Sequence, residues 1–308
     1  MDLKGKDVLT AAQFTREQIE ELFAVADDFS ARLQKGERLR RLDGKLLATV
    51  FYEPSTRTRL SFESAMQRLG GGVLSVAEAK TASSAVKGET LADTVRTIEN
   101  YADAIVLRHP DVGAAQIAAQ AANAPILNAG DGAGEHPTQA LLDLYTMRAA
   151  KGKIDGLRIA LVGDLKNGRT VHSLARALSN YKVDFSLVAP AALAMPIQVC
   201  DYLRERDFVV EETNDLAQSL QKADVVYMTR VQKERFADPK QYEKLKNFFI
   251  LNRELVSRAK PNLLVMHPLP RVDEITTDVD AMPNAAYFQQ AKNGVYIRMA
   301  LLSEILGG

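Results

Sequence analysis

Short apolar runs alternate with amphipathic helical patterns along most of the 308-residue chain. The runs are rich in Val, Leu, Ile and Ala, as is typical of strands buried on both faces of a sheet. Strands that alternate with helices pair in parallel, because each crossover helix brings the next strand back in the same direction. We predict strands at 46–52, 73–76, 104–107, 125–128, 157–162, 185–188, 208–210, 223–229 and 262–266.

The helical patterns carry recognisable start and stop signals. Residues 1–45 are predicted to be helical, with a capping box formed by Thr15 and Gln18 and a stop at Gly36. One further helix is expected to begin within the turn 163–173. The others are predicted at 60–69, 90–101, 111–122, 140–148, 196–206, 214–222, 253–259 and 286–306.

A polar, glycine-punctuated segment at 151–156 separates two such series and predicts a domain boundary. We therefore assign residues 1–150 to a first domain and 151–285 to a second. The last predicted helix is long enough to cross back, so residues 286–308 are assigned to the first domain. The expected architecture is α/β, with two Rossmann-like domains that each hold a mainly parallel sheet flanked by helices.

Composition narrows the class of protein. The chain is 46% hydrophobic and 25% charged, as in ordinary globular proteins, and its 39 basic residues balance 39 acidic ones. No overall field would attract nucleic acid or an anionic membrane, and no apolar run approaches membrane-spanning length. The single cysteine, Cys200, excludes an internal disulfide and fits a reducing compartment. We expect a cytoplasmic enzyme or binding protein.

The clearest chemical signal follows the predicted strand 46–52. Ser55, Thr56, Arg57 and Thr58 crowd the first turn of the next helix. Backbone N–H groups and the helix dipole favour an anion there, while hydroxyls and a guanidinium add hydrogen bonds to phosphoryl oxygens. A lone Ser-Thr-Arg is more often an ordinary capped helix start. The third hydroxyl and the strand-to-helix context favour a phosphate site.

Two arginines compete for that role. Arg57 and Arg59 lie two positions apart, so on a helix they cannot both face one ligand. Glu63 lies four positions after Arg59, and we expect those two side chains to form an ion pair. Arg57 is therefore the candidate for the ligand.

Other candidate side chains lie where strands end or helices begin. Because parallel strands end at one edge of a sheet, these side chains are expected to line one cleft between the domains. The group is rich in arginine but offers no set of metal ligands and no nucleophile paired with a base, so we expect neither a metal nor a cofactor. Such a site binds phosphate and carboxylate and acts by positioning and charge stabilisation. The candidates are Arg108, His136, Gln139, Arg169, Arg230, Gln232 and the loop 267–271.

Several positions keep two interpretations. His136 either donates from a neutral ring to a polarised carbonyl or merely caps the following helix. The segment 79–88 is expected to be a surface loop, in which a lone lysine such as Lys87 is usually only solvated. His172, inside a helix, fits packing better than chemistry. The turn 163–173 resembles a dinucleotide-binding turn but lacks the G-x-G-x-x-G spacing, which argues against a nicotinamide-dependent oxidoreductase.

The motifs together resemble a known family. Ser55-Thr56-Arg57-Thr58-Arg59, His136-Pro137-Thr138-Gln139 and His267-Pro268-Leu269-Pro270 are similar to signature segments of the carbamoyltransferases. More narrowly, Arg230-Val231-Gln232 and the Pro-Leu-Pro loop resemble the aspartate carbamoyltransferases, whereas ornithine enzymes typically carry cysteine in place of Pro268. The resemblance covers essentially the whole chain.

The resemblance implies a reaction and a role for each residue. The α-amine of L-aspartate would attack carbamoyl phosphate, giving N-carbamoyl-L-aspartate and phosphate in pyrimidine synthesis. The implied phosphate ligands are Ser55, Thr56, Arg57 and Thr58. Thr58, Arg108 and His136 would polarise the carbonyl oxygen. The implied partners of the carbamoyl NH2 are Gln139 and the carbonyl groups of Leu269 and Pro270, with the Leu269–Pro270 bond cis.

The resemblance also implies how aspartate and other subunits take part. Arg169 would bind the α-carboxylate of aspartate, and Arg230 with Gln232 would bind its β-carboxylate. Ser83 and Lys87 would reach into the site of a neighbouring subunit, which would make a homotrimer obligatory. Regulatory chains or another pyrimidine-pathway enzyme remain open as further partners. An acceptor other than aspartate, and a non-catalytic binding protein, are the remaining alternatives.

Overall fold

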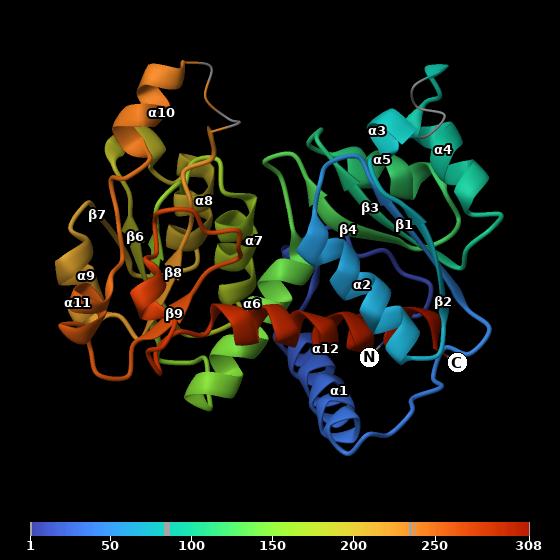
Figure 1. Ribbon diagram of the computed structural model, residues 1–308, viewed down its shortest axis with the longest axis horizontal. Helices are drawn as coiled ribbons and strands as arrows, with labels where there is room; N and C mark the ends of the chain where they lie inside the picture. Colours follow the sequence, from blue (N-terminus) through green and yellow to red (C-terminus); the bar gives the residue numbers. More distant parts are fainter. Residues whose placement is uncertain (1, 83–86, 234–235, 237, 308) are drawn as a thin grey trace. The chain divides into compact units, whose positions relative to one another are not determined.

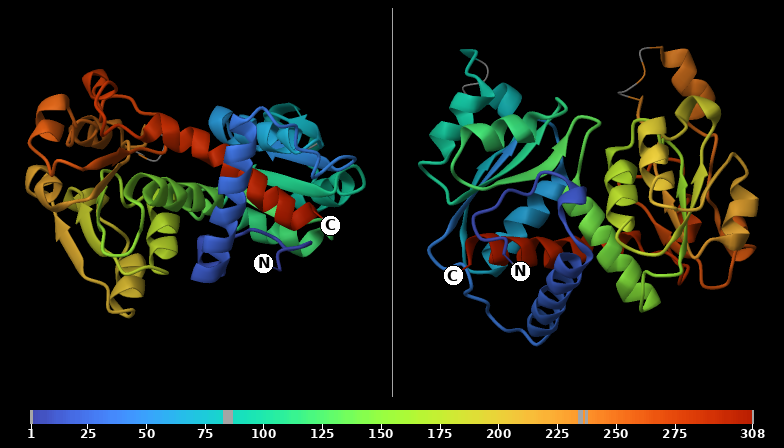
Figure 2. Two further views of the ribbon diagram at one scale, coloured as in Figure 1. Left: turned by 90° about the horizontal axis from the view of Figure 1, so that it is seen from below. Right: turned by 180° about the vertical axis from the view of Figure 1, so that it is seen from behind.

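The computed structural model describes residues 2–82, 87–233, 236 and 238–307. The chain folds as two compact units. Unit 1 runs to Leu142 and resumes at Lys292, and unit 2 is Asp143–Ala291. The divisions fall within two helices, α6 (Pro137–Lys151) and α12 (Tyr287–Leu306). Figures 1 and 2 show the helices arranged around one sheet in each unit.

Unit 1 is built on a four-stranded parallel sheet with the order β2-β1-β3-β4. Its strands are β1 (Leu46–Phe51), β2 (Gly72–Val76), β3 (Ala104–His109) and β4 (Ile126–Asp131). Its other elements are η1 (Ala11–Gln13), α1 (Arg16–Gln34), α2 (Thr56–Arg68), α3 (Ala79–Ala82), α4 (Leu91–Ile98) and α5 (Ala114–Ala121). Five of the six residues of β1 are buried, as expected for a strand covered on both faces.

Unit 2 holds a five-stranded parallel sheet with the order β7-β6-β5-β8-β9. Its strands are β5 (Arg158–Val162), β6 (Asp184–Val188), β7 (Val210–Thr213), β8 (Val225–Met228) and β9 (Leu264–Met266). Its other elements are α7 (Arg169–Leu178), η3 (Ala191–Leu193), α8 (Ile197–Arg204), α9 (Leu216–Lys222), α10 (Pro239–Leu245), α11 (Arg253–Ser257) and η5 (Thr277–Val279).

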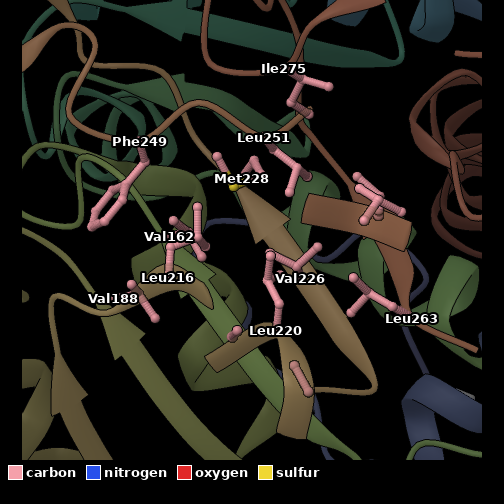
Figure 3. Close-up of a cluster of buried hydrophobic side chains, with 14 of the residues drawn as sticks. Val162, Val188, Leu216, Leu220, Val226, Met228, Phe249, Leu251, Leu263 and Ile275 are labelled. Atoms are coloured by element: carbon pink, nitrogen blue, oxygen red, sulfur yellow. The ribbon is translucent and has the colours of Figure 1, made fainter. Parts of the chain in front are cut away.

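Strand β8 illustrates how the sheet of unit 2 is covered on both faces. Successive side chains of a strand point to opposite faces. Val226 and Met228 join Leu220 of α9 in one buried cluster, drawn in Figure 3. Tyr227 points to the opposite face, where its hydroxyl donates to a carboxylate oxygen of Asp143 on α6 at 2.8 Å. The predicted α/β class, with parallel sheets and a long last helix, is confirmed.

The prediction that residues 1–45 are helical was wrong for about half of that segment, because the described residues 2–45 contain only the helices η1 and α1. Val8 instead extends the edge of the sheet beside β4: its N–H donates to the Ile126 carbonyl at 2.8 Å, and Asn128 N–H donates to the Val8 carbonyl at 2.8 Å. The open edge of β4 offers hydrogen-bond partners that local helical propensity cannot match. The capping box of Thr15 and Gln18 is confirmed.

Two helices form where the sequence did not predict a helix. Within 79–88, Ala79–Ala82 forms α3, because alanine favours helix and Ala79 is fully buried in the core of unit 1. In the charged stretch after β8, α10 begins at Pro239 with the Asp238 side chain accepting from Lys240 N–H. The strand predicted at 208–210 lies at Val210–Thr213.

Candidate active site

The carboxyl ends of β1 and β3 mark the place in unit 1 where the chain changes direction across the sheet. From β1 the chain crosses to β2 on one side, whereas from β3 it crosses to β4 on the other side. The two strands are neighbours, with Phe51 paired to Arg108. Open α/β sheets bind their ligands at such a switch point, because the loops diverge there.

The first turn of α2 lies directly after β1. Ser55 is the N-cap residue, and its carbonyl accepts from Arg59 N–H at 3.1 Å. Thr56 and Arg57 are exposed, whereas Thr58 is buried. The first N–H groups of a helix have no partner within it, so this turn presents donors and the positive end of the dipole at the switch point.

Arg59 is turned to the other side of α2. Its guanidinium lies 3.5 Å from Glu63 Oε1 and donates to Ser75 Oγ of β2 at 2.9 Å. Glu63 also accepts from the hydroxyls of Thr49 and Ser75, at 2.9 and 2.7 Å. The predicted Arg59–Glu63 pair is confirmed, and it anchors α2 to β1 and β2.

Arg108 and His136 approach the same switch point. The Arg108 guanidinium donates to the Ala129 carbonyl at 3.1 Å and lies 3.4 Å from Glu53 Oε2. His136 is buried just before α6, and its Nε2 lies 3.5 Å from Thr58 Oγ1. Thr58 and His136 are 78 positions apart in sequence, so this contact depends on the parallel pairing of β1, β3 and β4.

Asp131 holds the turn that carries His136, and sequence reasoning missed it. Its Oδ1 accepts from Glu135 N–H at 2.8 Å, and its Oδ2 accepts from Gly113 N–H at 2.8 Å. The side chain therefore joins the loop after β4 to the loop after β3. An aspartate directly before a glycine-rich loop was the available signal, since such a carboxylate commonly bonds nearby backbone N–H groups.

Arg298 of α12 was also missed. Only 3% of the residue is exposed; its guanidinium donates to Ser61 Oγ of α2 at 2.9 Å and to Thr138 Oγ1 of α6 at 3.2 Å. The same group lies over the Phe62 ring, 4.9 Å from its centroid. Arg298 thus joins the two helices that start at the candidate site. An arginine inside the otherwise apolar run 296–302 was the signal in the sequence.

In unit 2 the corresponding switch point lies between β5 and β8. The chain leaves β5 toward β6 and leaves β8 toward β9, in opposite directions across the sheet. Arg169 is the first residue of α7, which follows β5. Gly163 makes this arrangement possible, since it has φ +112° and an added Cβ would lie 2.3 Å from the Thr229 carbonyl oxygen.

Gln232 and Arg230 follow β8 at the same edge. Gln232 Nε2 donates to the Asn167 carbonyl at 3.2 Å, and its backbone N–H lies 3.4 Å from Asp164 Oδ2. Gln232 is therefore held against the turn that leads to Arg169. Arg169 and the pair Arg230 and Gln232 are more than 60 positions apart in sequence. They follow neighbouring parallel strands at the same edge of the sheet, as predicted from their places after strand ends.

The loop after β9 contains the expected cis peptide bond between Leu269 and Pro270.

Three other residues were singled out from the sequence. Lys87 is exposed, and Ser83 lies outside the described residues. His172 is buried with Nε2 2.7 Å from the Leu165 carbonyl, which agrees with the predicted packing role.

Within the described ranges, no helix is both long and apolar enough to cross a bilayer. No group of three His, Cys, Asp or Glu side chains in the same ranges is arranged to hold a metal ion.

Two parallel sheets with arginines at their switch points are typical of α/β proteins that bind anionic small molecules. Family models match nearly the whole chain: the "Aspartate/ornithine carbamoyltransferase, carbamoyl-P binding domain" matches residues 6–149, and the "Asp/Orn binding domain" of the same family matches residues 155–305. The chain belongs to the aspartate/ornithine carbamoyltransferase family.

Individual relatives are similar over their full lengths. The aspartate carbamoyltransferase catalytic subunit of Thermococcus kodakarensis is 53% identical, over 100% of this chain and 99% of that protein. That of Methanopyrus kandleri is 53% identical, over 99% and 98%. The crystal structure of Trypanosoma cruzi aspartate transcarbamoylase in complex with carbamoyl phosphate and aspartate has a TM-score of 0.95 and 44% identity, covering 99% of this chain and 98% of that one.

Proposed function

We propose that this protein is an aspartate carbamoyltransferase (EC 2.1.3.2). It transfers the carbamoyl group of carbamoyl phosphate to the α-amine of L-aspartate, giving N-carbamoyl-L-aspartate and phosphate in de novo pyrimidine biosynthesis. The observation that carries the proposal is the convergence of Thr58, Arg108 and His136 on one switch point. Support also comes from the full-length similarity to relatives with this name.

Carbamoyl phosphate binds at the first turn of α2. Ser55, Thr56, Arg57 and Thr58 hold the phosphate, and Ser83 adds a further contact from a neighbouring subunit. The exposure of Arg57 and the donors of the helix N-terminus support this assignment. The binding site for the carbamoyl NH2 is formed by Gln139 and the carbonyl groups of Leu269 and Pro270.

Thr58, Arg108 and His136 act on the carbonyl oxygen. As the aspartate amine attacks, a C–N bond forms and negative charge gathers on this oxygen. The C–O bond then breaks, and the leaving phosphate takes up the proton that the amine loses. Hydrogen-bond donors that are already in place stabilise this charge. Such electrostatic stabilisation is usually the largest single contribution to catalysis. The contacts that hold Arg108 and the nearness of Thr58 to His136 support this role.

Aspartate binds through its two carboxylates. Arg169 takes the α-carboxylate, and Arg230 with Gln232 takes the β-carboxylate. A guanidinium can bind a carboxylate through two hydrogen bonds at once, which fixes its orientation. An arginine at position 230 would repel the cationic side chain of ornithine, and Pro268 stands where ornithine enzymes typically carry cysteine.

The two substrates divide between two domains. Residues 1–150 with 286–308 form the carbamoyl-phosphate-binding domain, and residues 151–285 form the aspartate-binding domain. The ends of the two family-model matches, at 149 and 155, support the boundary near residue 150. The assignment of the last helix to the first domain is supported by the return of the chain to unit 1 at Lys292.

The active protein is a homotrimer whose sites are shared between subunits. Lys87 and Ser83 complete the site of the neighbouring subunit.

A cytoplasmic location is part of the proposal and is supported by the single cysteine. The further partners of the protein are regulatory chains or another pyrimidine-pathway enzyme. Relatives that are named catalytic subunits support the first, and the similar segment of a multifunctional protein of Dictyostelium discoideum, 48% identical over 14% of that protein, supports the second.

The direct test measures ureido product from carbamoyl phosphate, in parallel with L-aspartate and L-ornithine. Product with aspartate alone is expected. Product with ornithine alone would retain the phosphate site and overturn the roles of Arg230 and Gln232. Product with neither would indicate a different acceptor or a binding protein without turnover.

A further inference from the structure

A buried histidine–glutamate pair brackets the loop that follows β9. His267 is 1% exposed and Glu274 is 5% exposed, and His267 Nε2 lies 2.7 Å from Glu274 Oε1. At one end of the loop, Leu269 N–H donates to His267 Nδ1 at 2.7 Å. At the other end, Val272 N–H donates to Glu274 Oε2 at 3.1 Å. The pair therefore fixes two backbone groups three residues apart.

These contacts determine where the imidazole carries its proton. A backbone N–H can only donate, so His267 Nδ1 must accept from Leu269, and the ring proton must lie on Nε2. That proton points at Glu274. Burial alone raises the pKa of Glu274, but hydrogen bonds from His267 and from backbone N–H groups outweigh burial and lower it, so the carboxylate is ionised and accepts.

His267 is also held through its backbone. Its backbone N–H donates to Gln290 Oε1 at 3.0 Å, and Gln290 Nε2 donates to Asp143 Oδ1 at 2.7 Å. Asp143 Oδ2 accepts from the Tyr227 hydroxyl at 2.8 Å. Gln290, Asp143 and Tyr227 are each at most 1% exposed. A buried chain of paired polar groups of this kind is rigid, because each group would lose its partner if one moved.

The hydrogen bonds made by His267 and Glu274 orient particular peptide planes of the loop. Each peptide unit is planar, so a hydrogen bond to its N–H orients the whole plane. His267 orients the plane between residues 268 and 269, and Glu274 orients the plane between 271 and 272. The carbonyl groups of Leu269 and Pro270 belong to the two planes in between.

We propose that His267, oriented by Glu274, is a positioning residue for carbamoyl transfer. By holding Leu269 N–H it directs the carbonyl groups of Leu269 and Pro270 at the NH2 group of carbamoyl phosphate before the substrate binds. This inference rests on the proposed function for the role of those two carbonyls. Neither His267 nor Glu274 touches the substrate, so their effect is on orientation alone.

Two substitutions of His267 test the roles of Nδ1 and Nε2 one at a time. In His267→Asn the amide oxygen lies near the place of Nδ1 and can still accept from Leu269 N–H, as asparagine does two residues before a backbone N–H in many turns. In His267→Gln the longer amide can still donate to Glu274 but leaves Leu269 N–H unbonded. Ser186→Ala serves as the control, because it removes a different buried hydrogen bond of unit 2, from Ser186 Oγ to Ser219 Oγ at 3.4 Å.

The readout is steady-state kinetics of the full chain with both substrates, together with the thermal midpoint. His267→Gln is expected to lower kcat/KM for carbamoyl phosphate by about 10- to 100-fold, the usual effect of misplacing a contact group by about 1 Å. His267→Asn is expected to retain most of the wild-type value, and Ser186→Ala to leave it unchanged. Equal kinetics in all three variants, or equal losses in both His267 variants, would overturn the inference.

Hydrogen exchange at the Leu269 amide provides a readout that needs no turnover. It should accelerate in His267→Gln and stay slow in His267→Asn and Ser186→Ala. Equal exchange in the two His267 variants would show that the ring does not hold Leu269, and would also overturn the inference. Absence of ureido product from the wild-type chain would overturn the proposed function, whereas the exchange comparison would still decide whether His267 holds the loop.

Discussion

Arg57 and Arg59 stand two positions apart in α2 and have different surroundings. Arg59 is held by Glu63 and Ser75 on the side of β2, whereas Arg57 is exposed at the start of the helix. Arg59 therefore anchors the helix, whereas Arg57 binds phosphate in our proposal. The difference comes from the 100° rotation between successive helical residues, which places the two side chains on different faces.

Replacing Arg57 with alanine should abolish most turnover and leave the fold intact. Loss of a charged donor that stabilises the transition state costs about 10²- to 10³-fold in kcat. The side chain is exposed, so the free energy of unfolding should change little. Steady-state kinetics and urea unfolding of the same preparation test both statements.

Arg59→Ala is the matched control for Arg57→Ala. It removes an ion pair on the other side of the helix and should cost at most about 1 kcal/mol of stability while turnover persists. Near-normal activity in Arg57→Ala would contradict the proposed phosphate site, and equal losses in both variants would point to damage of α2 itself.

At the scale of elements, both switch points depend on short connections with demanding geometry. In unit 2 the turn between β5 and α7 passes the end of β8 so closely that only glycine fits at position 163. In unit 1 the carboxylate of Asp131 performs a similar task by joining two loops. The sheets bring the candidate residues to one edge, and these connections decide their positions within it.

Gly163→Ala should destabilise the protein by more than about 2 kcal/mol, because the new Cβ needs a strained φ and meets the Thr229 carbonyl. Gly152→Ala is the control: Gly152 also has a positive φ but nothing lies within 4 Å of an added Cβ, so about 1 kcal/mol is expected. Urea denaturation measures the two free energies of unfolding. Equal losses would contradict the close approach of β8.

The loop after β9 should weaken in acid. The pKa of Glu274 lies below its ordinary value of 4.5 in the folded protein. Its carboxylate therefore contributes stability that is fully present above 4.5 and is lost as the pH falls through the lowered folded value. Between pH 6 and roughly pH 3.5, the wild type should lose more unfolding free energy than Glu274→Gln, which has no charge to titrate. Parallel losses would contradict this account.

At the scale of the whole molecule, the proposal requires sites shared between subunits. Lys87→Ala and Arg57→Ala chains should each be inactive as homotrimers. A site in a mixed trimer is intact when one subunit supplies Arg57 and its neighbour supplies Lys87, so a random equal mixture should recover about a quarter of the wild-type activity.

The control for that mixture combines Arg57→Ala with Thr58→Ala. Both changes fall on the same side of each shared site, so the mixture should stay inactive after subunit exchange. If the Lys87 mixture also stays inactive after confirmed exchange, Lys87 acts within its own chain.

Predictions from the sequence succeeded where the cause was local. The Arg59–Glu63 pair and the Thr15 capping box follow from helical spacing and were confirmed. The start of the segment 1–45 was mispredicted because Val8 finds its partners on β4, more than 100 positions away. Asp131 and Arg298 were missed for the same reason: their roles lie in contacts with segments that no local pattern identifies.

The α/β class, the parallel pairing and the type of residue at each strand end follow from the order of residues alone, because hydrophobic periodicity and capping are properties of neighbouring positions. Which of those residues meet depends on the tertiary fold. Strand order set the two switch points, placed Thr58 beside His136 and Gln232 against the β5–α7 turn, and buried His267 with Glu274. Strand order is decided by packing across the whole sheet, so residues far apart in sequence become neighbours only when the chain has folded.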